Sequence, residues 1–156
     1  MIIGIGSDHA AFAMKEEIKQ YLEEQGHRLL DYGCYSEERC DYPVFGEKVA
    51  RAIAAGEAER GVLICGTGVG ISLAANKVKG IRAAVCSEPY TARLVKQHND
   101  AQIIAFGARV VGIGMAKMIV DEFLKAEFEG GRHRDRLALL TAIEEKTCNL
   151  RAVGVE

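Results

Sequence analysis

Short apolar runs alternate with longer amphipathic segments along most of the chain. The run at residues 62–65 is apolar throughout instead of alternating with polar residues, which is typical of a strand in a buried parallel sheet. The short runs together predict strands at residues 2–7, 28–32, 62–65, 82–86 and 102–106. Parallel strands joined through helices need right-handed crossovers, so the helices must cover both faces of the sheet.

The segments between the strands place apolar residues at helical spacing and carry helix start and stop signals. Pro43 and Pro89 suit the first turn of a helix, and Gly26 and Gly56 suit a helix end. The expected helices cover residues 10–25, 43–55, 69–77, 89–98, 112–128 and 134–146. The sequence therefore predicts an α/β protein, a Rossmann-like three-layer α/β/α sandwich with a five-stranded parallel sheet. A single domain would cover residues 1–146, and residues 147–156 would form a C-terminal tail.

The composition is that of an ordinary soluble protein, and it narrows the classes of partner. The 156 residues carry a net charge of -2, so no basic surplus points to nucleic acid or to an anionic membrane. No apolar run reaches the length of a membrane span, and we expect no leader before the first strand. The five cysteines are odd in number and form no C-x-x-C pair. That usage argues against a disulfide framework and a zinc site, and it favours a reducing cytoplasm.

In open parallel sheets, ligands bind beyond the carboxyl ends of the strands. That rule selects residues 7–9, 65–70, 87–88 and 107–109 as candidates. We expect two histidines, His9 and His98, to converge with Cys65 on this one edge. Taken singly, Asp8 and His9 also fit a helix N-cap and a solvated histidine, and His98 fits a helix end favoured by the dipole.

The glycine-rich turn after residues 62–65 is the most informative motif. Its glycines, Gly66, Gly68 and Gly70, match neither the dinucleotide fingerprint nor the Walker A spacing. Their backbone N–H groups can approach an anion closely, and the helix that follows adds the positive end of its dipole. A plain tight turn and an anion site explain the glycines about equally well, and the presence of Cys65 and Thr67 favours the site.

Cys65 is the candidate base or nucleophile. It stands where the strand ends and faces the positive field of the turn, which favours the thiolate. A lone cysteine is more often a small buried hydrophobe, and Cys86 occupies a similar strand end. Cys34, Cys40 and Cys148 are interpreted as incidental.

A short basic run at residues 132–136 offers a phosphate contact. Arg132 and Arg136 are four residues apart, so both guanidinium groups can share one helical face and hold a phosphate between them. Arg109 could add a third guanidinium. The alternative is a solvated helix start, and the run is too short for nucleic acid.

These motifs and several others resemble one known family in the same order along the chain. The chain resembles the type B ribose-5-phosphate isomerases, the group that includes allose- and galactose-6-phosphate isomerases. The resemblance extends from residue 1 to about residue 146. The resembling segments are residues 6–9, 41–43, 64–72, 74–77, 80–83, 86–90, 97–100, 106–109 and 128–133.

By position, the resemblance implies that Cys65 is the base that moves a proton between C1 and C2. Thr67 and His98 would assist opening of the furanose ring, with His98 as the acid. Ile71 stands where another branch carries a glutamate, so the chain resembles the cysteine branch. The remaining implied contacts to the sugar, the enediolate and the phosphate are Asp8, His9, Gly66, Gly68, Val69, Gly70, Asn99, Arg109, Arg132 and Arg136.

The implied activity is a cofactor-independent aldose–ketose isomerisation of the pentose phosphate pathway, between ribose 5-phosphate and ribulose 5-phosphate through an enediolate. Alternatives are an allose- or galactose-6-phosphate isomerase and, in another class, a non-catalytic sugar-phosphate-binding module. Neither a cofactor nor a metal is expected. The resemblance also implies a homodimer or homotetramer with sites shared between subunits.

Overall fold

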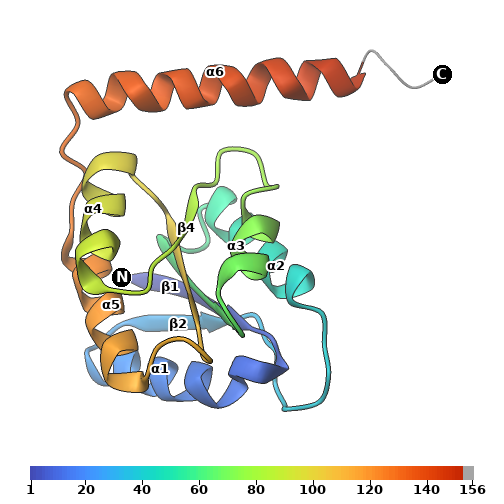
Figure 1. The fold of residues 1–156 in the computed structure, drawn as a ribbon, viewed down its shortest axis with the longest axis vertical. Coiled ribbons are helices and arrows are strands. Elements are labelled where there is room, and N and C mark those ends of the chain that lie inside the picture. Colours follow the sequence, from blue (N-terminus) through green and yellow to red (C-terminus); the bar gives the residue numbers. More distant parts are fainter. Residues whose placement is uncertain (153–156) are drawn as a thin grey trace.

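The structure, a computed structural model, describes the backbone of residues 1–152 and the side chains of residues 1–147. Strands alternate with helices along the chain, as the hydrophobic pattern predicts (Figure 1). The strands are β1 (Ile2–Ser7), β2 (Arg28–Asp31), β3 (Arg60–Cys65), β4 (Ala83–Val85) and β5 (Ile103–Gly107). The helices are α1 (Phe12–Glu24, after a 3-10 turn at His9–Ala11), α2 (Tyr42–Ala54), α3 (Val69–Ala75), α4 (Pro89–Asn99), α5 (Ile113–Lys125) and α6 (Arg132–Ala152).

All five strands are parallel and form one sheet in the order β2-β1-β3-β5-β4. The predicted fold class, an α/β sandwich around a five-stranded parallel sheet, is therefore confirmed. β3 occupies the centre of the sheet, between β1 and β5. Because β1 and β3 are neighbours while β2 lies on the far side of β1, the chain changes direction across the sheet between them, and such a switch point is where parallel sheets bind ligands.

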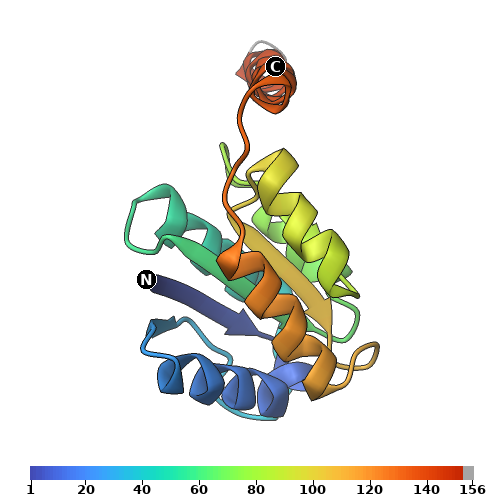
Figure 2. The same cartoon turned by 90° about the vertical axis from the view of Figure 1, so that its left-hand side faces the viewer.

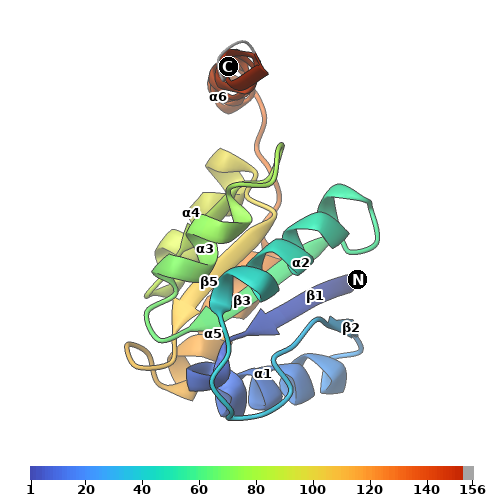
Figure 3. The same cartoon turned by 90° about the vertical axis from the view of Figure 1, so that its right-hand side faces the viewer.

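Helices cover both faces of the sheet (Figures 2 and 3). Alternate residues of β3 pack into the two layers. Val62 and Ile64 pack into the cluster that α1, α4 and α5 share. Leu63 and Cys65 pack into the cluster under α2 and α3. Cys65 therefore belongs to the α2–α3 side, at the end of the central strand.

Small residues let α2 lie very close to the sheet and to α3. A Cβ on Gly6 would lie 3.1 Å from Val49 of α2, and a Cβ on Gly46 would lie 2.7 Å from the carbonyl oxygen of Ile71. This packing places the start of α2 beside the glycine-rich turn.

Helix α6 lies apart from the sandwich and crosses over one end of it (Figure 1). It touches the body mainly at α4 and through Glu144, whose carboxylate accepts the N–H of Gly80 at 3.0 and 3.1 Å. The helix continues to Ala152, beyond the expected helix end at residue 146. The apolar period that marks other helices is weak in α6, because the chain's own core does not cover that helix. Cys148 lies outside the residues whose side chains are described.

Among the helices that the structure describes, none is both long and apolar enough to cross a membrane.

Candidate functional site

The ends of β1, β3 and β5 bring the first group of predicted residues together. Cys65 pairs in register with Gly107, and Ser7 pairs with Ile64. The N–H of Asp8 donates to the Ile64 carbonyl at 3.2 Å, and the N–H of Ala108 donates to the Cys65 carbonyl at 2.9 Å. The loops after three strands are thus tied to one another at the switch point, as expected.

The sulfur of Cys65 is buried and accepts a backbone hydrogen bond. The N–H of Gly68 donates to Cys65 Sγ at 3.1 Å, and the N–H of Val69 donates to Thr67 Oγ1 at 3.3 Å. The sulfur therefore lies at the head of the turn with a backbone N–H directed at it. Gly70 lies in the first turn of α3, where backbone N–H groups have no intrahelical acceptor and can serve a ligand oxygen.

Two glycines are required for this turn to keep its shape. Gly68 has a φ of +82°, and a Cβ there would lie 2.8 Å from the backbone of Phe106. A Cβ on Gly107 would lie 2.6 Å from Thr67 Cα. The turn and the end of β5 therefore pack backbone against backbone, which fixes the N–H groups around Cys65.

Arg109 and Tyr42 border the turn. The N–H of Arg109 donates to the Gly66 carbonyl at 3.1 Å, and a Cβ on Gly66 would lie 3.3 Å from Arg109 Nη1. The guanidinium thus lies over Gly66, where an anion bound at the turn can reach it. A Cβ on Gly70 would lie 2.7 Å from the ring of Tyr42, a residue that the sequence analysis did not single out.

Asp8 does not cap the following helix with its side chain, so the interpretation of this residue as a helix N-cap is wrong. Its side chain makes no capping hydrogen bond, and Oδ1 is buried without a partner among the described residues. The neighbouring Ser7 Oγ is also buried without a hydrogen-bond partner among the described residues. Buried polar atoms normally have partners, so a polar group of a ligand would satisfy these oxygens.

His9 is held by the loop before α2. Its Nδ1 lies 3.2 Å from the backbone nitrogen of Cys40 and 3.3 Å from the Cys40 carbonyl oxygen, so either tautomer of the ring can hydrogen-bond to this residue. Burial raises the pKa of Cys40 to about 11, and the neighbouring Cys34 makes the next largest contribution. Burial also raises the pKa of Cys86 to about 12, with a contribution from Glu88. Both cysteines therefore remain thiols at neutral pH, and their sulfurs lack the N–H bond that Cys65 receives.

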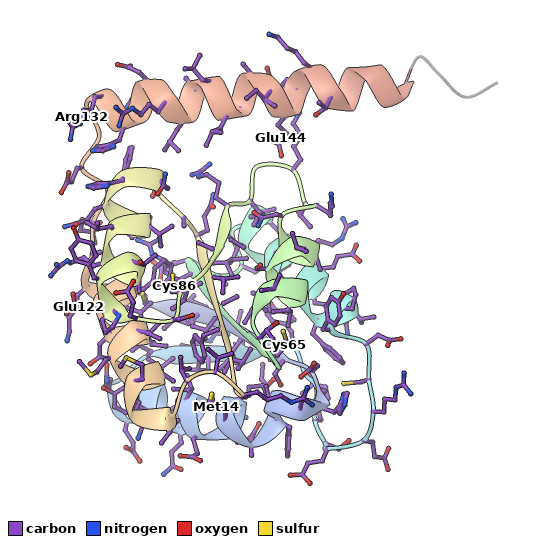
Figure 4. The ribbon with its side chains drawn as sticks, viewed as in Figure 1. Met14, Cys65, Cys86, Glu122, Arg132 and Glu144 are labelled. Carbon is purple, nitrogen blue, oxygen red and sulfur yellow. The ribbon has the colours of Figure 1, made fainter. Side chains whose placement is uncertain are left out.

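The second group of predicted residues lies at the opposite end of the sheet, where the strands begin. His98 and Asn99 end α4, which runs back to the starting edge of β5, and Arg132 and Arg136 belong to the first turns of α6. The register pairs Gly61 with Ile103 and Cys65 with Gly107, and the rise of a strand puts these two levels about 13 Å apart. The expectation that His98 converges with Cys65 on one edge of the chain is therefore wrong. Figure 4 shows Arg132, at the start of α6, far from Cys65.

Sequence reasoning missed two partners of His98. The rings of His98 and His133 stack with centroids 4.3 Å apart and planes 5° from parallel. Glu129 Oε2 lies 3.8 Å from His98 Nε2 and 3.7 Å from His133 Nε2. Burial lowers the pKa of His133, and the charges of His98, Arg132 and Arg136 lower it further. His133 stood within the basic run, but nothing in the sequence joined Glu129 to His98.

Comparisons with known proteins show the family and support the fold. A family model described as Ribose/Galactose Isomerase matches residues 3–140. The chain is 56% identical over 144 residues to ribose-5-phosphate isomerase B of Escherichia coli (strain K12), covering 92% of this chain and 97% of that protein. It is 48% identical over 129 residues to the galactose-6-phosphate isomerase subunit LacB of Clostridium acetobutylicum, covering 83% of this chain and 75% of that protein. The structure of Clostridium thermocellum ribose-5-phosphate isomerase B superposes with a TM-score of 0.93 at 54% identity, covering 94% of this chain and 99% of that one.

Proposed function

The chain belongs to the ribose/galactose isomerase family, and on that premise we propose that it interconverts ribose 5-phosphate and ribulose 5-phosphate without a cofactor. The observation that carries the proposal is the N–H of Gly68 donating to the sulfur of Cys65 at the head of the glycine-rich turn. Aldose–ketose isomerisation needs a base at the carbon-bound proton and donors for the developing oxyanion. This turn provides both within a few residues.

In the proposed reaction, the Cys65 thiolate removes the proton from C2 of the open-chain aldose and returns it to C1. The negative charge that develops on the enediolate oxygen meets N–H groups of the turn, Gly70 among them. Asp8, whose buried oxygen lacks a protein partner, would receive a sugar hydroxyl. Because the donors are backbone groups held by packing, they need little reorganisation during the reaction.

Ring opening needs an acid, and the edge around Cys65 does not contain His98. We propose that Thr67 of one subunit and His98 of a neighbouring subunit act together, so that each site spans two chains. The described part of one chain carries the two halves of such a site at opposite edges of the sheet. An assembly in which these edges meet, a homodimer or a homotetramer, would complete the site twice or more by symmetry.

Helix α6 supports an assembly of this kind. Its side chains Leu139, Leu140 and Ile143 are largely exposed, although each is a large apolar residue. A helix that leaves its own sandwich with such residues uncovered needs another surface to bury them. Because α6 begins with Arg132 and Arg136, seating it on a second subunit would also carry those arginines toward that subunit's site.

The phosphate would be held by arginines from both chains. Arg109 lies over Gly66 in the same chain as Cys65. Arg132 and Arg136 would come from the neighbour, together with Asn99 as a polar contact to the sugar. Guanidinium groups match a phosphate through paired hydrogen bonds, and remote phosphate binding orients the flexible open-chain sugar for proton transfer.

A hexose 6-phosphate is the alternative substrate, because the chain is 48% identical to the Clostridium acetobutylicum LacB subunit. The discriminating experiment measures kcat/KM for ribose 5-phosphate, allose 6-phosphate and galactose 6-phosphate side by side, with Cys65→Ala as the blank. A preference for the pentose phosphate supports the proposal. A preference for either hexose phosphate would make that sugar the main substrate and leave the proposed mechanism unchanged. Binding of all three without turnover would favour the sugar-phosphate-binding module instead.

A further inference from the structure

We propose that His98, Glu129 and His133 form a binding site for a divalent transition-metal ion such as Zn²⁺, and that the occupied site inhibits the enzyme. The three residues offer two imidazole nitrogens and one carboxylate oxygen, all within 4.8 Å of one another. They come from three separate segments: the end of α4, the loop after α5 and the start of α6. The carboxylate oxygen lies at nearly equal distances from the two Nε2 atoms.

The distances are close to those of a metal site. Zinc–nitrogen and zinc–oxygen bonds of about 2.0–2.2 Å place neighbouring ligands of a tetrahedral ion about 3.3–3.6 Å apart. Glu129 Oε2 lies 3.8 and 3.7 Å from the two Nε2 atoms, so contraction by a few tenths of an ångström is required. The stacked rings must also tilt toward each other. The Glu129 side chain is half exposed and can follow that movement.

The backbone around these ligands is already fixed. The N–H of Glu129 donates to the Gln97 carbonyl at 3.0 Å, which ties the loop to the residue before His98. The N–H of His133 donates to the Gly130 carbonyl at 3.1 Å. Gly130 and Gly131 both have positive φ values and reverse the chain between Glu129 and His133. A metal ion would therefore find its ligands held on a rigid frame.

The ligand types select the class of metal. Imidazole with one carboxylate suits zinc, copper and nickel, whereas magnesium and calcium prefer sites made of oxygen ligands. Arg132 and Arg136 lie on the same helix as His133 and repel a cation, so the Glu129 carboxylate is needed to offset their charge. With three protein ligands, a fourth coordination position remains open to water.

Binding would have two consequences. A metal ion would connect α4 to α6, which the described side chains otherwise join only weakly. It would also occupy the imidazole of His98, and on the proposed function that histidine is the acid for ring opening. Metal binding and turnover would then exclude each other, and ribose 5-phosphate would compete with the metal.

The first experiment titrates metal-free protein with Co²⁺ and follows visible absorption, because four-coordinate Co²⁺ absorbs strongly and reports its ligands. We expect saturable absorption without the sulfur-to-metal band that a cysteine ligand would add. Glu129→Gln and His133→Asn should each weaken Co²⁺ at least about tenfold, since losing only an outer partner of a ligand costs 10–100-fold. Glu127→Gln, an exposed carboxylate two residues earlier, is the matched control and should bind as the wild type does.

Unchanged affinity in both Glu129→Gln and His133→Asn, or a sulfur band in the wild type, would overturn the site. Thermal unfolding with Zn²⁺ gives a second measurement, in which the melting temperature should rise in the wild type and in Glu127→Gln but not in Glu129→Gln. Inhibition is tested separately, by Zn²⁺ titration of ribose 5-phosphate turnover. Metal binding without inhibition would overturn the inhibitory role alone. An inactive protein that still binds Co²⁺ through these residues would overturn the proposed function and leave the metal site standing.

Discussion

The backbone amide of Gly68 donates a hydrogen bond to the sulfur of Cys65 at 3.1 Å. This bond depends on the left-handed conformation of Gly68, with a φ of +82°, and on the absence of a side chain where Phe106 passes. The amide that stabilises the proposed thiolate is therefore positioned by the contact between the turn and β5. A change at Gly68 should affect folding and catalysis together.

Gly68→Ala should lower the free energy of unfolding by more than about 2 kcal/mol and reduce kcat sharply, because strain at positive φ adds to a clash with the Phe106 backbone. Gly26→Ala is the matched control: its φ is +84°, but nothing lies within 4 Å of the added Cβ. It should cost only about 1 kcal/mol and leave kcat unchanged. Chemical denaturation and steady-state kinetics measure both effects. Equal losses of stability and kcat in the two variants would mean that the Phe106 contact does not position the turn.

Mixing two inactive variants tests whether each site spans two chains. Cys65→Ala and His98→Asn should each be inactive alone. Subunits that exchange after mild denaturation would form mixed dimers, in which one site unites an intact Cys65 with an intact His98. An equal mixture should then recover about a quarter of the wild-type activity, from the statistics of random pairing in a symmetric dimer. Activity that stays at the level of the separate variants would place the whole site within one chain, or remove His98 from it.

Arg136→Ala should mainly raise KM for ribose 5-phosphate, by about tenfold or more, since a charge-assisted hydrogen bond contributes about 1.5–3 kcal/mol. The kcat value should change little, because the phosphate is remote from the transferred proton. Arg134→Ala removes an exposed arginine from the same helix and serves as the control. An unchanged KM in Arg136→Ala would exclude this residue from the phosphate site.

The sheet and the turn around Cys65 could be predicted from the sequence because local signals determine them. Apolar runs mark buried strands, and glycines mark the turn. The position of His98 is also predictable, because a residue between a helix and the next parallel strand lies where the strands begin, at the end of the sheet opposite Cys65. Glu129 could not have been assigned, because its place beside His98 depends on a chain reversal at Gly130 and Gly131. The end of α6 could not be predicted either, because the described part of the chain packs against this helix mainly near its start and at Glu144.

Lys15 and Asp31 form a buried ion pair that links α1 to the end of β2. Lys15 Nζ lies 2.6 Å from Asp31 Oδ2, and the exposed fractions of the two side chains are 0% and 14%. Asp31→Asn should lower the free energy of unfolding by about 2 kcal/mol, because the buried Lys15 ammonium loses one of its two carboxylate partners and keeps only Glu16 at 2.7 Å. The control is Glu47→Gln, which breaks an equally short pair with Arg51 at 2.7 Å whose side chains are 51% and 70% exposed. That change should cost less than about 0.5 kcal/mol.

The same pair should make the free energy of unfolding depend on pH in the acidic range. Burial alone would raise the pKa of Asp31, but hydrogen bonds from Lys15 and from the Gly33 N–H bring it below its usual value of 3.8. Because the folded-state pKa is the lower one, the stabilisation is complete above the unfolded-state value and is lost as pH falls through the folded-state value. Urea unfolding of the wild type between pH 6 and pH 3, at fixed protein concentration, should show this loss. Asp31→Asn should show a flatter pH dependence over that range, and a curve parallel to the wild type would mean that Asp31 is not stabilised in its charged form.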